Sequence, residues 1–374
     1  MTAAQTPERF AGSPAGPGLH DVMVSVAAAL GVPGFDDRLG LPGAPRYVVV
    51  LVDGLGADLL REHADAAPFL AALAGIPGVR SGIPSTTATS LTSLGTGLQA
   101  GQHGVVGYTS REPASGRRIN ALSWADDVDP LQWQPHTTVL ERMVATGMAA
   151  SVVNDAAFES SGLTLCSQRG VPFHGIGSVW ERQDVVLDVV EETTRGLVYA
   201  YESRLDHTGH RYGCTSGQWR DMLTTIDHDL ARLRAELPVD TVLLVTSDHG
   251  MVDLPDEGRF DMESVPSLRD DVTLIAGEAR FRHVYTRSGA EQDVAGHWAE
   301  VLGERAVVRT QEGLEDWLGP IDERVRPRIG DVVVAALGDF AVFSSMDFAI
   351  EFKMAGFHGS ITDAERNIPV LVAH

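Results

Sequence analysis

The chain has 374 residues, of which 44% are hydrophobic and 21% charged, a composition that excludes a largely disordered protein. Its 51 acidic and 29 basic side chains give a formal net charge of −22. This argues against a nucleic-acid polymer as partner, because binding a phosphate backbone requires a basic surface. A small anionic substrate is compatible with this acidity, since bound metal ions reverse the local field in a site built from carboxylates.

Neither end of the sequence indicates a membrane protein. No stretch reaches the roughly 18 consecutive apolar residues of a membrane-spanning helix, and the N-terminus lacks the basic region of a signal peptide. We therefore expect a cytoplasmic protein without a membrane partner, of unknown oligomeric state.

Residues 1–20, rich in Pro, Gly, Ala and Ser, predict a loose leader. Cys166 and Cys214 form no CxxC pair and are interpreted as buried thiols rather than metal ligands.

Residues 21–374 are interpreted as one catalytic domain of the α/β class. Four apolar segments that end in polar residues predict buried strands: YVVVLVDG from Tyr47, AASVVND at 149–155, GLVYAYESRLD at 196–206 and TVLLVTSDHG at 241–250. Apolar residues at three- and four-residue spacing predict helices at 57–74, 138–146 and 217–237. Strands that alternate with helices predict a mostly parallel central sheet flanked by helices.

The region at about 265–345 has a different pattern and predicts a small α+β insertion. TLIAG at 273–277 and FRHVY at 281–285 are expected to pair as a hairpin. A helix near 290–303, a strand at 306–310 and a helix at 312–318 are expected to follow. Arg282 and His283 in this hairpin could touch the leaving group of a substrate, but are interpreted as solvated surface charge.

Three of the predicted strands lead into an aspartate, and three histidines lie near these aspartates or close to the C-terminus. The carboxyl ends of parallel strands form the ligand-binding edge of such a sheet, so Asp53, Asp206 and Asp248 are expected to share one site. The motif DHTGH spaces Asp206 and His210 so that one turn of chain aims both at one ion. His249 follows Asp248 directly, and His358 lies between glycines in GFHGS. Each residue alone has a structural explanation as a turn former, cap or loop histidine.

Together, these oxygen and nitrogen donors predict a metal site. They suit Zn²⁺ and would also accept Mn²⁺ or Fe²⁺. The segment IPSTTATSLTSLGTG at 83–97 supplies hydroxyl groups in a loop that leads into a predicted helix. Such hydroxyls can cap the helix, and a helix N-terminus is also an anion site. A hydroxyl activated by a divalent ion can act as the nucleophile in ester hydrolysis.

On these motifs the chain resembles the nucleotide pyrophosphatase/phosphodiesterase branch of the alkaline phosphatase superfamily, over roughly 46–110, 196–252 and 352–362. The resemblance implies two metal ions and a nucleophilic threonine. Thr87 is assigned to this role because the family's nucleophile stands three residues after a proline and nine before a Thr-Gly pair, here Pro84 and Thr96. Ser85, Thr86 and Ser90 remain alternatives. The implied ligands are Asp53, Thr87, Asp248 and His249 for one ion, and Asp206, His210 and His358 for the other.

The same resemblance implies hydrolysis of a small phosphorylated substrate, for example a nucleotide, through a phosphothreonine intermediate. Phosphodiesterase relatives have an asparagine that binds a phosphate oxygen where this chain has Tyr108, so Tyr108 is a candidate substrate contact and the diester assignment is weakened. A phosphomonoesterase, a mutase or a phosphonate hydrolase of the same superfamily is the alternative. A sulfatase is disfavoured, because neither cysteine lies in a C/S-x-P-x-R motif. From another class, a non-catalytic protein could keep the metals for stability.

Overall fold

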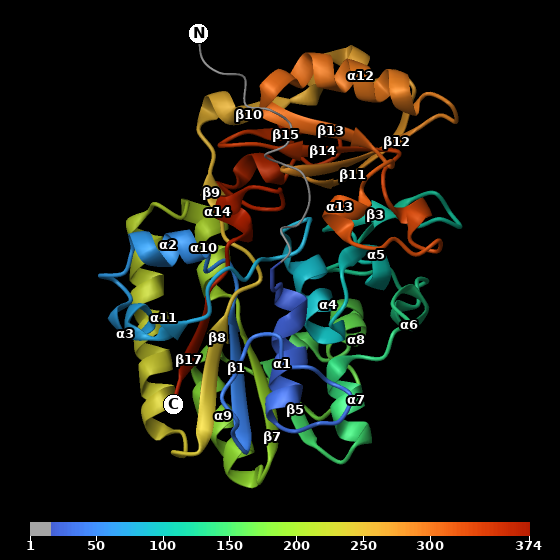
Figure 1. Ribbon diagram of the computed structural model, residues 1–374. Coiled ribbons are helices and arrows are strands. Elements are labelled where there is room, and N and C mark those ends of the chain that lie inside the picture. The colour runs from blue at the N-terminus through green and yellow to red at the C-terminus, as the bar shows by residue number, and fades with distance from the viewer. Residues whose placement is uncertain (1–15) are drawn as a thin grey trace.

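The computed structural model describes residues 16–374 and has a central seven-stranded sheet (Figure 1). The neighbouring strands follow the order β2-β17-β8-β1-β7-β5-β6. Five of them pair in parallel, while β17 pairs antiparallel with both β8 and β2. The bounds are β1 Arg46–Val52, β2 Ala74–Gly75, β5 Ala149–Asp155, β6 Phe173–Ile176, β7 Gly196–Glu202, β8 Thr241–Thr246 and β17 Val370–Ala373. The predicted α/β class with a mostly parallel central sheet is confirmed.

Strand β1 lies in the middle of this sheet and is buried on both faces. Successive side chains of a strand point to opposite faces, so Val49 and Leu51 join one apolar core while Val48 and Val50 join another. The first core is completed by α1 (Val22–Ala29), α4 (Thr87–Thr96) and α7 (Val139–Ala145). The second is completed by α9 (Arg182–Glu192) and α11 (Gly217–Glu236). The continuous apolar run of β1 therefore reflects a strand covered by helices on both sides.

Two of the three predicted helices are present, and the third is interrupted. The 138–146 and 217–237 predictions correspond to α7 and α11. The single helix predicted at 57–74 is wrong, because the chain forms α2 (Ala57–Glu62) and α3 (Pro68–Ala72) there. Pro68 cannot donate an intrahelical hydrogen bond but suits the first turn of a new helix. The Asp227 carboxylate in α11 accepts hydrogen bonds from the N–H groups of Phe69 and Leu70, which holds the start of α3.

A second, four-stranded antiparallel sheet lies above the carboxyl ends of the central strands (Figure 1). Its strand order is β11-β12-β14-β13, with bounds β11 Val272–Glu278, β12 Phe281–Thr286, β13 Ala306–Thr310 and β14 Val332–Ala336. Helix α12 (Glu291–Leu302) covers one face through Trp298 and Leu302. The predicted hairpin, helix and strand of this region are present, whereas the last helix, α13, spans only Glu315–Leu318 and β14 was not predicted. The division into one domain with an insertion stays a prediction.

Further short elements include η2 Leu19–Asp21, α5 Ala100–His103, β3 Thr109–Arg111, β4 Arg118–Asn120, α6 Pro130–Trp133, η3 Ala156–Phe158, α8 Gly162–Ser167, α10 Arg204–Tyr212, β9 Val252–Asp253, β10 Arg259–Asp261, β15 Ala341–Phe343, η10 Glu351–Lys353, β16 Gly356–Phe357 and α14 Asp363–Arg366. None of the described helices is long and apolar enough to cross a lipid bilayer. Of the predicted leader, residues 1–15 lie outside the described residues, while Leu19 and His20 belong to η2.

The interpretation of Arg282 and His283 as surface charge is wrong, because both side chains are fully buried in β12. Arg282 donates a hydrogen bond to the Val342 carbonyl and forms an ion pair with Glu351. His283 Nε2 donates to the Val106 carbonyl at 2.9 Å, and its Nδ1 accepts from the Gly330 N–H. Burial lowers the pKa of His283 to about 4, so it is a neutral structural group. The expected burial of both cysteines is confirmed.

One buried ion pair joins the four-stranded sheet to α14. Arg280, in the turn between β11 and β12, donates from Nε and Nη2 to the two carboxylate oxygens of Glu365, each at 2.8 Å. Both side chains are fully buried. Removing one partner leaves the other charge buried without compensation.

We expect Glu365→Ala to lower the free energy of unfolding by about 3–5 kcal/mol, measured by urea denaturation. The matched control is Asp184→Ala, which removes an exposed carboxylate paired with Arg232. A solvated pair contributes little, so this control should unfold close to wild type. Equal losses in the two variants would contradict the importance of the buried pair.

Candidate functional site

The three predicted aspartates meet at the carboxyl ends of the central strands. Strand β1 lies between β7 and β8, so Asp53 after β1 and Asp248 after β8 are neighbours. Asp206 is not at the strand end itself, because β7 ends at Glu202 and Asp206 lies in the first turn of α10. Gly54 allows the loop after β1 to lie close to Asp206. Its φ is +75°, and a Cβ there would lie 3.2 Å from the Cα of Asp206. The expected shared site is therefore formed.

Asp53, Asp248 and His249 form the first cluster of ligand atoms, and all three are buried. His249 Nε2 lies 3.4 Å from Asp53 Oδ1 and 3.3 Å from Asp248 Oδ2. The Thr87 hydroxyl lies 3.2 Å from the same nitrogen. The structure thus brings together all four residues assigned to one ion.

Asp206, His210 and His358 form the second cluster. The helix α10 presents Asp206 and His210 on one face with a separation of 3.4 Å between Oδ1 and Nε2, because residues i and i+4 of a helix are neighbours. His358 follows β16 and places its Nε2 3.7 Å from Asp206 Oδ1 and 3.2 Å from His210 Nε2. The clusters adjoin, since the rings of His249 and His358 stack with their centroids 3.6 Å apart.

Main-chain carbonyl groups set the orientation of all three histidines. The Nδ1 atoms of His210, His249 and His358 lie 2.8–3.0 Å from carbonyl oxygens, those of Gly356, Gly250 and Ser85 respectively. A carbonyl oxygen only accepts, so each Nδ1 carries the proton and donates. Each Nε2 is then left as a lone pair directed toward the carboxylates. Fixing the tautomer in this way is the usual role of the groups behind a metal-binding histidine.

The carboxylates likewise keep one oxygen free. The Tyr201 hydroxyl donates to Asp53 Oδ2, while the N–H groups of Gly54 and His249 donate to Asp248 Oδ1. Among the described residues, no hydrogen bond reaches the buried oxygens Asp53 Oδ1, Asp206 Oδ1 and Asp248 Oδ2. Buried polar atoms without partners are costly. The free oxygens and Nε2 lone pairs converge, and this donor set fits divalent metal ions.

The pKa shifts of Asp53 and His358 also fit a site for divalent metal ions. Burial, followed by the negative charges of Asp206 and Asp248, raises the pKa of Asp53 well above its usual range. Burial lowers the pKa of His358 well below its usual value, and the neighbouring His249 and His210 lower it further. Charged carboxylates and neutral imidazoles are the forms that bind a metal. A bound cation would favour both forms at once.

Thr87 is the hydroxyl best placed to react. It occupies the first position of α4, whose free N–H groups face the same region. Two of the alternative hydroxyls are buried and already engaged: Ser85 donates to the Ser360 carbonyl at 2.7 Å, and Ser90 donates to the Asp248 carbonyl at 3.0 Å. Thr86 lines the same cavity as Thr87, but its side chain is buried and its hydroxyl bonds Glu278. Thr87 both lines this cavity and contacts the first cluster.

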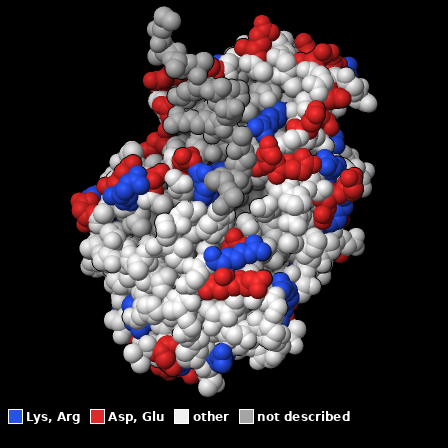
Figure 2. Space-filling view, viewed as in Figure 1, with Lys and Arg blue, Asp and Glu red and all other residues white. Residues whose placement is uncertain are grey.

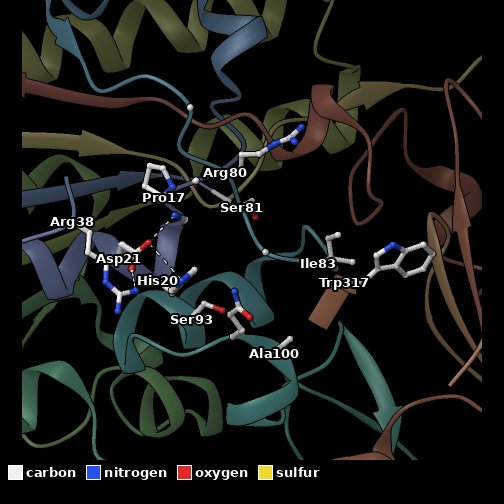
Figure 3. Close-up of a pocket in the computed structure, with 15 residues that line it drawn as sticks. Pro17, His20, Asp21, Arg38, Arg80, Ser81, Ile83, Ser93, Ala100 and Trp317 are labelled. Carbon is white, nitrogen blue, oxygen red and sulfur yellow. Dashed lines mark hydrogen bonds and ion pairs between the residues drawn. The ribbon is translucent and has the colours of Figure 1, made fainter. Parts of the chain in front are cut away.

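This cavity has a volume of about 540 Å³ and contains members of both clusters, Thr87 and Tyr108 in its wall. A second cavity of about 540 Å³ lies beside α4, lined by His20, Asp21, Arg38, Arg80 and Trp317 among others (Figure 3). In it Asp21 forms an ion pair with Arg38. Because none of the predicted site residues lines the second cavity, the candidate site is the one at Thr87.

The sequence analysis missed Glu278 and Tyr201. Glu278 ends β11, one residue beyond the predicted strand, and lines the cavity as a fully buried side chain of the other sheet. Burial raises its pKa to about 8, although hydrogen bonds from the Thr86 hydroxyl and the Tyr108 N–H act against this shift. An acidic residue at the end of an apolar hairpin was the available signal. Tyr201 is one residue before the end of β7, and no motif marks it.

Known proteins share both the sequence pattern and the fold of this chain. The family model described as type I phosphodiesterase / nucleotide pyrophosphatase matches residues 47–361. The structure of murine ectonucleotide pyrophosphatase / phosphodiesterase 5 is similar, with a TM-score of 0.69 at 19% identity. An inactive variant of the murine protein in complex with AMP (TM-score 0.67, 18% identity) and the human protein (0.65, 18%) are also similar. In each case the match covers 87% of both chains.

The raised pKa of Glu278 predicts a pH dependence of stability in the metal-free protein. The folded chain keeps the proton up to a pH of about 8, whereas the unfolded carboxyl, with an ordinary pKa of 4.5, has lost it. The unfolded state then binds fewer protons, so the free energy of unfolding falls as the pH rises from 4.5 to 8. Relative to Glu278→Gln, we expect wild type to lose several kcal/mol over this window.

Urea denaturation at pH 5 and pH 8, with a chelator present, measures this difference. Glu159→Gln, a change of the same kind on the exposed segment after η3, is the control and should track wild type. A constant difference in stability between wild type and Glu278→Gln across the window would contradict the raised pKa.

Proposed function

The chain belongs to the type I phosphodiesterase / nucleotide pyrophosphatase family and is a hydrolytic enzyme, and from this premise we propose that it cleaves a small phosphodiester through a phosphothreonine intermediate at Thr87. One observation carries the proposal: the Thr87 hydroxyl at the N-terminus of α4 contacts His249 of the first cluster, and the second cluster adjoins it. A non-catalytic protein that keeps metals for stability has no need of a cavity-facing hydroxyl in this position.

The family is metal-dependent, and we propose that the site takes two ions. Asp53, Asp248, His249 and Thr87 would hold one, and Asp206, His210 and His358 the other. The mixture of carboxylate and imidazole favours Zn²⁺, with Mn²⁺ and Fe²⁺ as alternatives. When bound, divalent ions supply Lewis-acid stabilisation and lower the pKa of hydroxyl groups and water.

The residues of the chain then account for each step. Thr87 loses its proton, and its oxygen bonds to phosphorus while the bond to the leaving group breaks. The proton departs with the leaving group, which is released as an alcohol. The free N–H groups at the start of α4 donate to the non-bridging oxygens, and Tyr108 in the cavity wall is a further proposed contact. Water next attacks phosphorus and the bond to Thr87 breaks, which releases a phosphomonoester and restores the hydroxyl. The Nδ1 hydrogen bonds of the histidines keep the ligands in place throughout.

The proposed substrate is a small molecule, and the murine relative in complex with AMP supports a nucleotide-like ligand. On the face shown in Figure 2, acidic and basic side chains are interspersed in small groups without an extended basic area. This supports the proposal that no nucleic-acid polymer is bound. The cytoplasmic location stays a prediction from the sequence.

We expect Thr87→Ala to lower kcat for bis-p-nitrophenyl phosphate by at least about 10³-fold, because removal of a nucleophile abolishes the covalent route. The control is Thr92→Ala, which removes a hydroxyl of the same helix that bonds only the Ala88 carbonyl. Assays with p-nitrophenyl phosphate run beside these. Undiminished turnover in Thr87→Ala would refute the nucleophile, and faster cleavage of the monoester would favour the phosphomonoesterase alternative.

Metal analysis of the purified active enzyme should find two divalent ions per chain. His358→Ala removes one ligand of the second cluster and is expected to lower the content toward one, with loss of most activity, since loss of a ligand weakens metal binding. His174→Ala, in β6, is the control and should retain both ions. Full activity with a single ion would contradict the two-ion proposal.

A further inference from the structure

The walls of the cavity at Thr87 differ in character from its floor. Asp53 and the three residues of the second cluster line its floor, whereas several segments of the chain contribute large apolar side chains to the walls, beside polar ones such as Asn154 and Gln168. The apolar side chains include Leu91, Leu122, Phe158, Leu163, Ile350 and Met354. A group attached to a phosphoryl group at Thr87 would therefore meet these apolar side chains along part of the wall.

Three of these side chains form what we call the apolar rim: Leu122, Phe158 and Ile350. They are 48%, 41% and 61% exposed and come from separate segments, after β4, in η3 and before η10. Single exposed apolar residues are common, but several around one cavity mark a surface that binds an apolar partner. The rim belongs to the same cavity as Thr87 and both clusters, which makes a substrate the natural occupant.

The charged residues in the cavity wall are all acidic. Among the described residues that line it there is no Lys or Arg, while Glu278 and Glu351 add to the aspartates of the floor. Glu351 is neutralised by Arg282, but that guanidinium is fully buried behind it. Proteins bind additional phosphate groups with Arg, Lys or main-chain N–H groups. The second phosphoryl group of a pyrophosphate would meet carboxylates, apolar side chains and neutral polar groups such as Asn154 and Gln168, without a guanidinium or ammonium group among the described residues of the lining.

We propose that the substrate carries a single phosphoryl group in a diester, that one of its two alcohols is an apolar alkyl or aryl group, and that this group packs against the apolar rim. This inference rests on the proposed function and narrows it from phosphodiesters in general to apolar ones, in place of the nucleotide-like ligand that the murine relative suggests. Each methylene group of the substrate that is buried against the apolar rim should raise kcat/KM about fourfold, because burying apolar surface lowers the free energy of the bound state. Polyphosphates such as ATP lack this gain and meet no Lys or Arg among the described residues that line the cavity.

The holoenzyme as purified tests this with methyl, butyl and octyl esters of p-nitrophenyl phosphate. The three diesters share the leaving group and the single negative charge, so only the apolar length varies. We expect kcat/KM to rise at least tenfold from methyl to butyl and further to octyl, and ATP to be a poorer substrate than the butyl ester. A flat series, or faster turnover of ATP, would overturn the inference. So would faster cleavage of the p-nitrophenyl ester of thymidine 5′-phosphate than of the octyl ester, since a nucleoside would then fit best.

Substitutions in the apolar rim test whether these side chains cause the dependence of kcat/KM on alkyl length. Ile350→Ser and Phe158→Ser should each lower the ratio of octyl to methyl kcat/KM by several fold. The control Val239→Ser, at a 93% exposed position between α11 and β8, should leave the ratio unchanged. Leu122→Arg adds the missing cation and should raise the turnover of ATP relative to the butyl ester. An unaltered ratio in both serine variants would place the apolar group elsewhere and overturn the inference.

Different results would contradict the proposed function and the inference about the apolar alcohol. If wild type turns over none of the esters, including the methyl ester, or does so independently of Thr87, the proposed function fails. If Thr87-dependent turnover is present but insensitive to chain length, only the inference about the apolar alcohol fails.

Discussion

The structure depends on the convergence of three carboxylates, each of which has one buried oxygen without a hydrogen-bond partner among the described residues. Asp53, Asp206 and Asp248 come from the ends of adjacent central strands or the helix that follows, and their free oxygens face the Nε2 lone pairs of three histidines. Such an arrangement is strongly unfavourable without positive charge, since both the burial and the mutual repulsion raise its free energy. The surrounding fold must supply that free energy and keep the groups from turning away.

The fold does so with contacts that are neither acidic nor catalytic. Carbonyl groups of Ser85, Gly250 and Gly356 orient the imidazoles, and the Tyr201 hydroxyl donates to Asp53 Oδ2, which leaves Oδ1 as the free oxygen. The same loops are short and tightly packed, so a side chain at Gly54 would strain the backbone and crowd Asp206. A preorganised site of this kind binds a metal with little rearrangement, which is also the condition for stabilising a transition state.

The second sheet borders the site. It lies over the carboxyl ends of the central strands and contributes Glu278 to the cavity wall, while the Arg280–Glu365 pair ties it to α14. Arg282 of this sheet is buried in an ion pair with Glu351 and does not line the cavity. Asp53, Asp248 and Thr87 thus come from the central sheet and α4, whereas Glu278 comes from the sheet above and the apolar rim from the segments around β4, η3 and η10.

From the sequence by itself we predicted the class of fold and the six residues of the two clusters, while the choice of Thr87 came from the resemblance to a known family; the roles of these residues stay predictions. Those signals are local: a buried parallel strand requires a continuous apolar run, Asp206 and His210 share one helical turn, and strand ends in a parallel sheet converge by geometry. Only the tertiary structure decided the burial of Arg282 and His283, the fourth strand β14, and the presence of Glu278 beside Thr86; the break between α2 and α3, by contrast, has a local cause in Pro68. The features that the tertiary structure decided depend on contacts between segments far apart in the chain, such as Arg282 with Glu351. Residue spacing cannot report such contacts, because they arise from the packing of one sheet over the other.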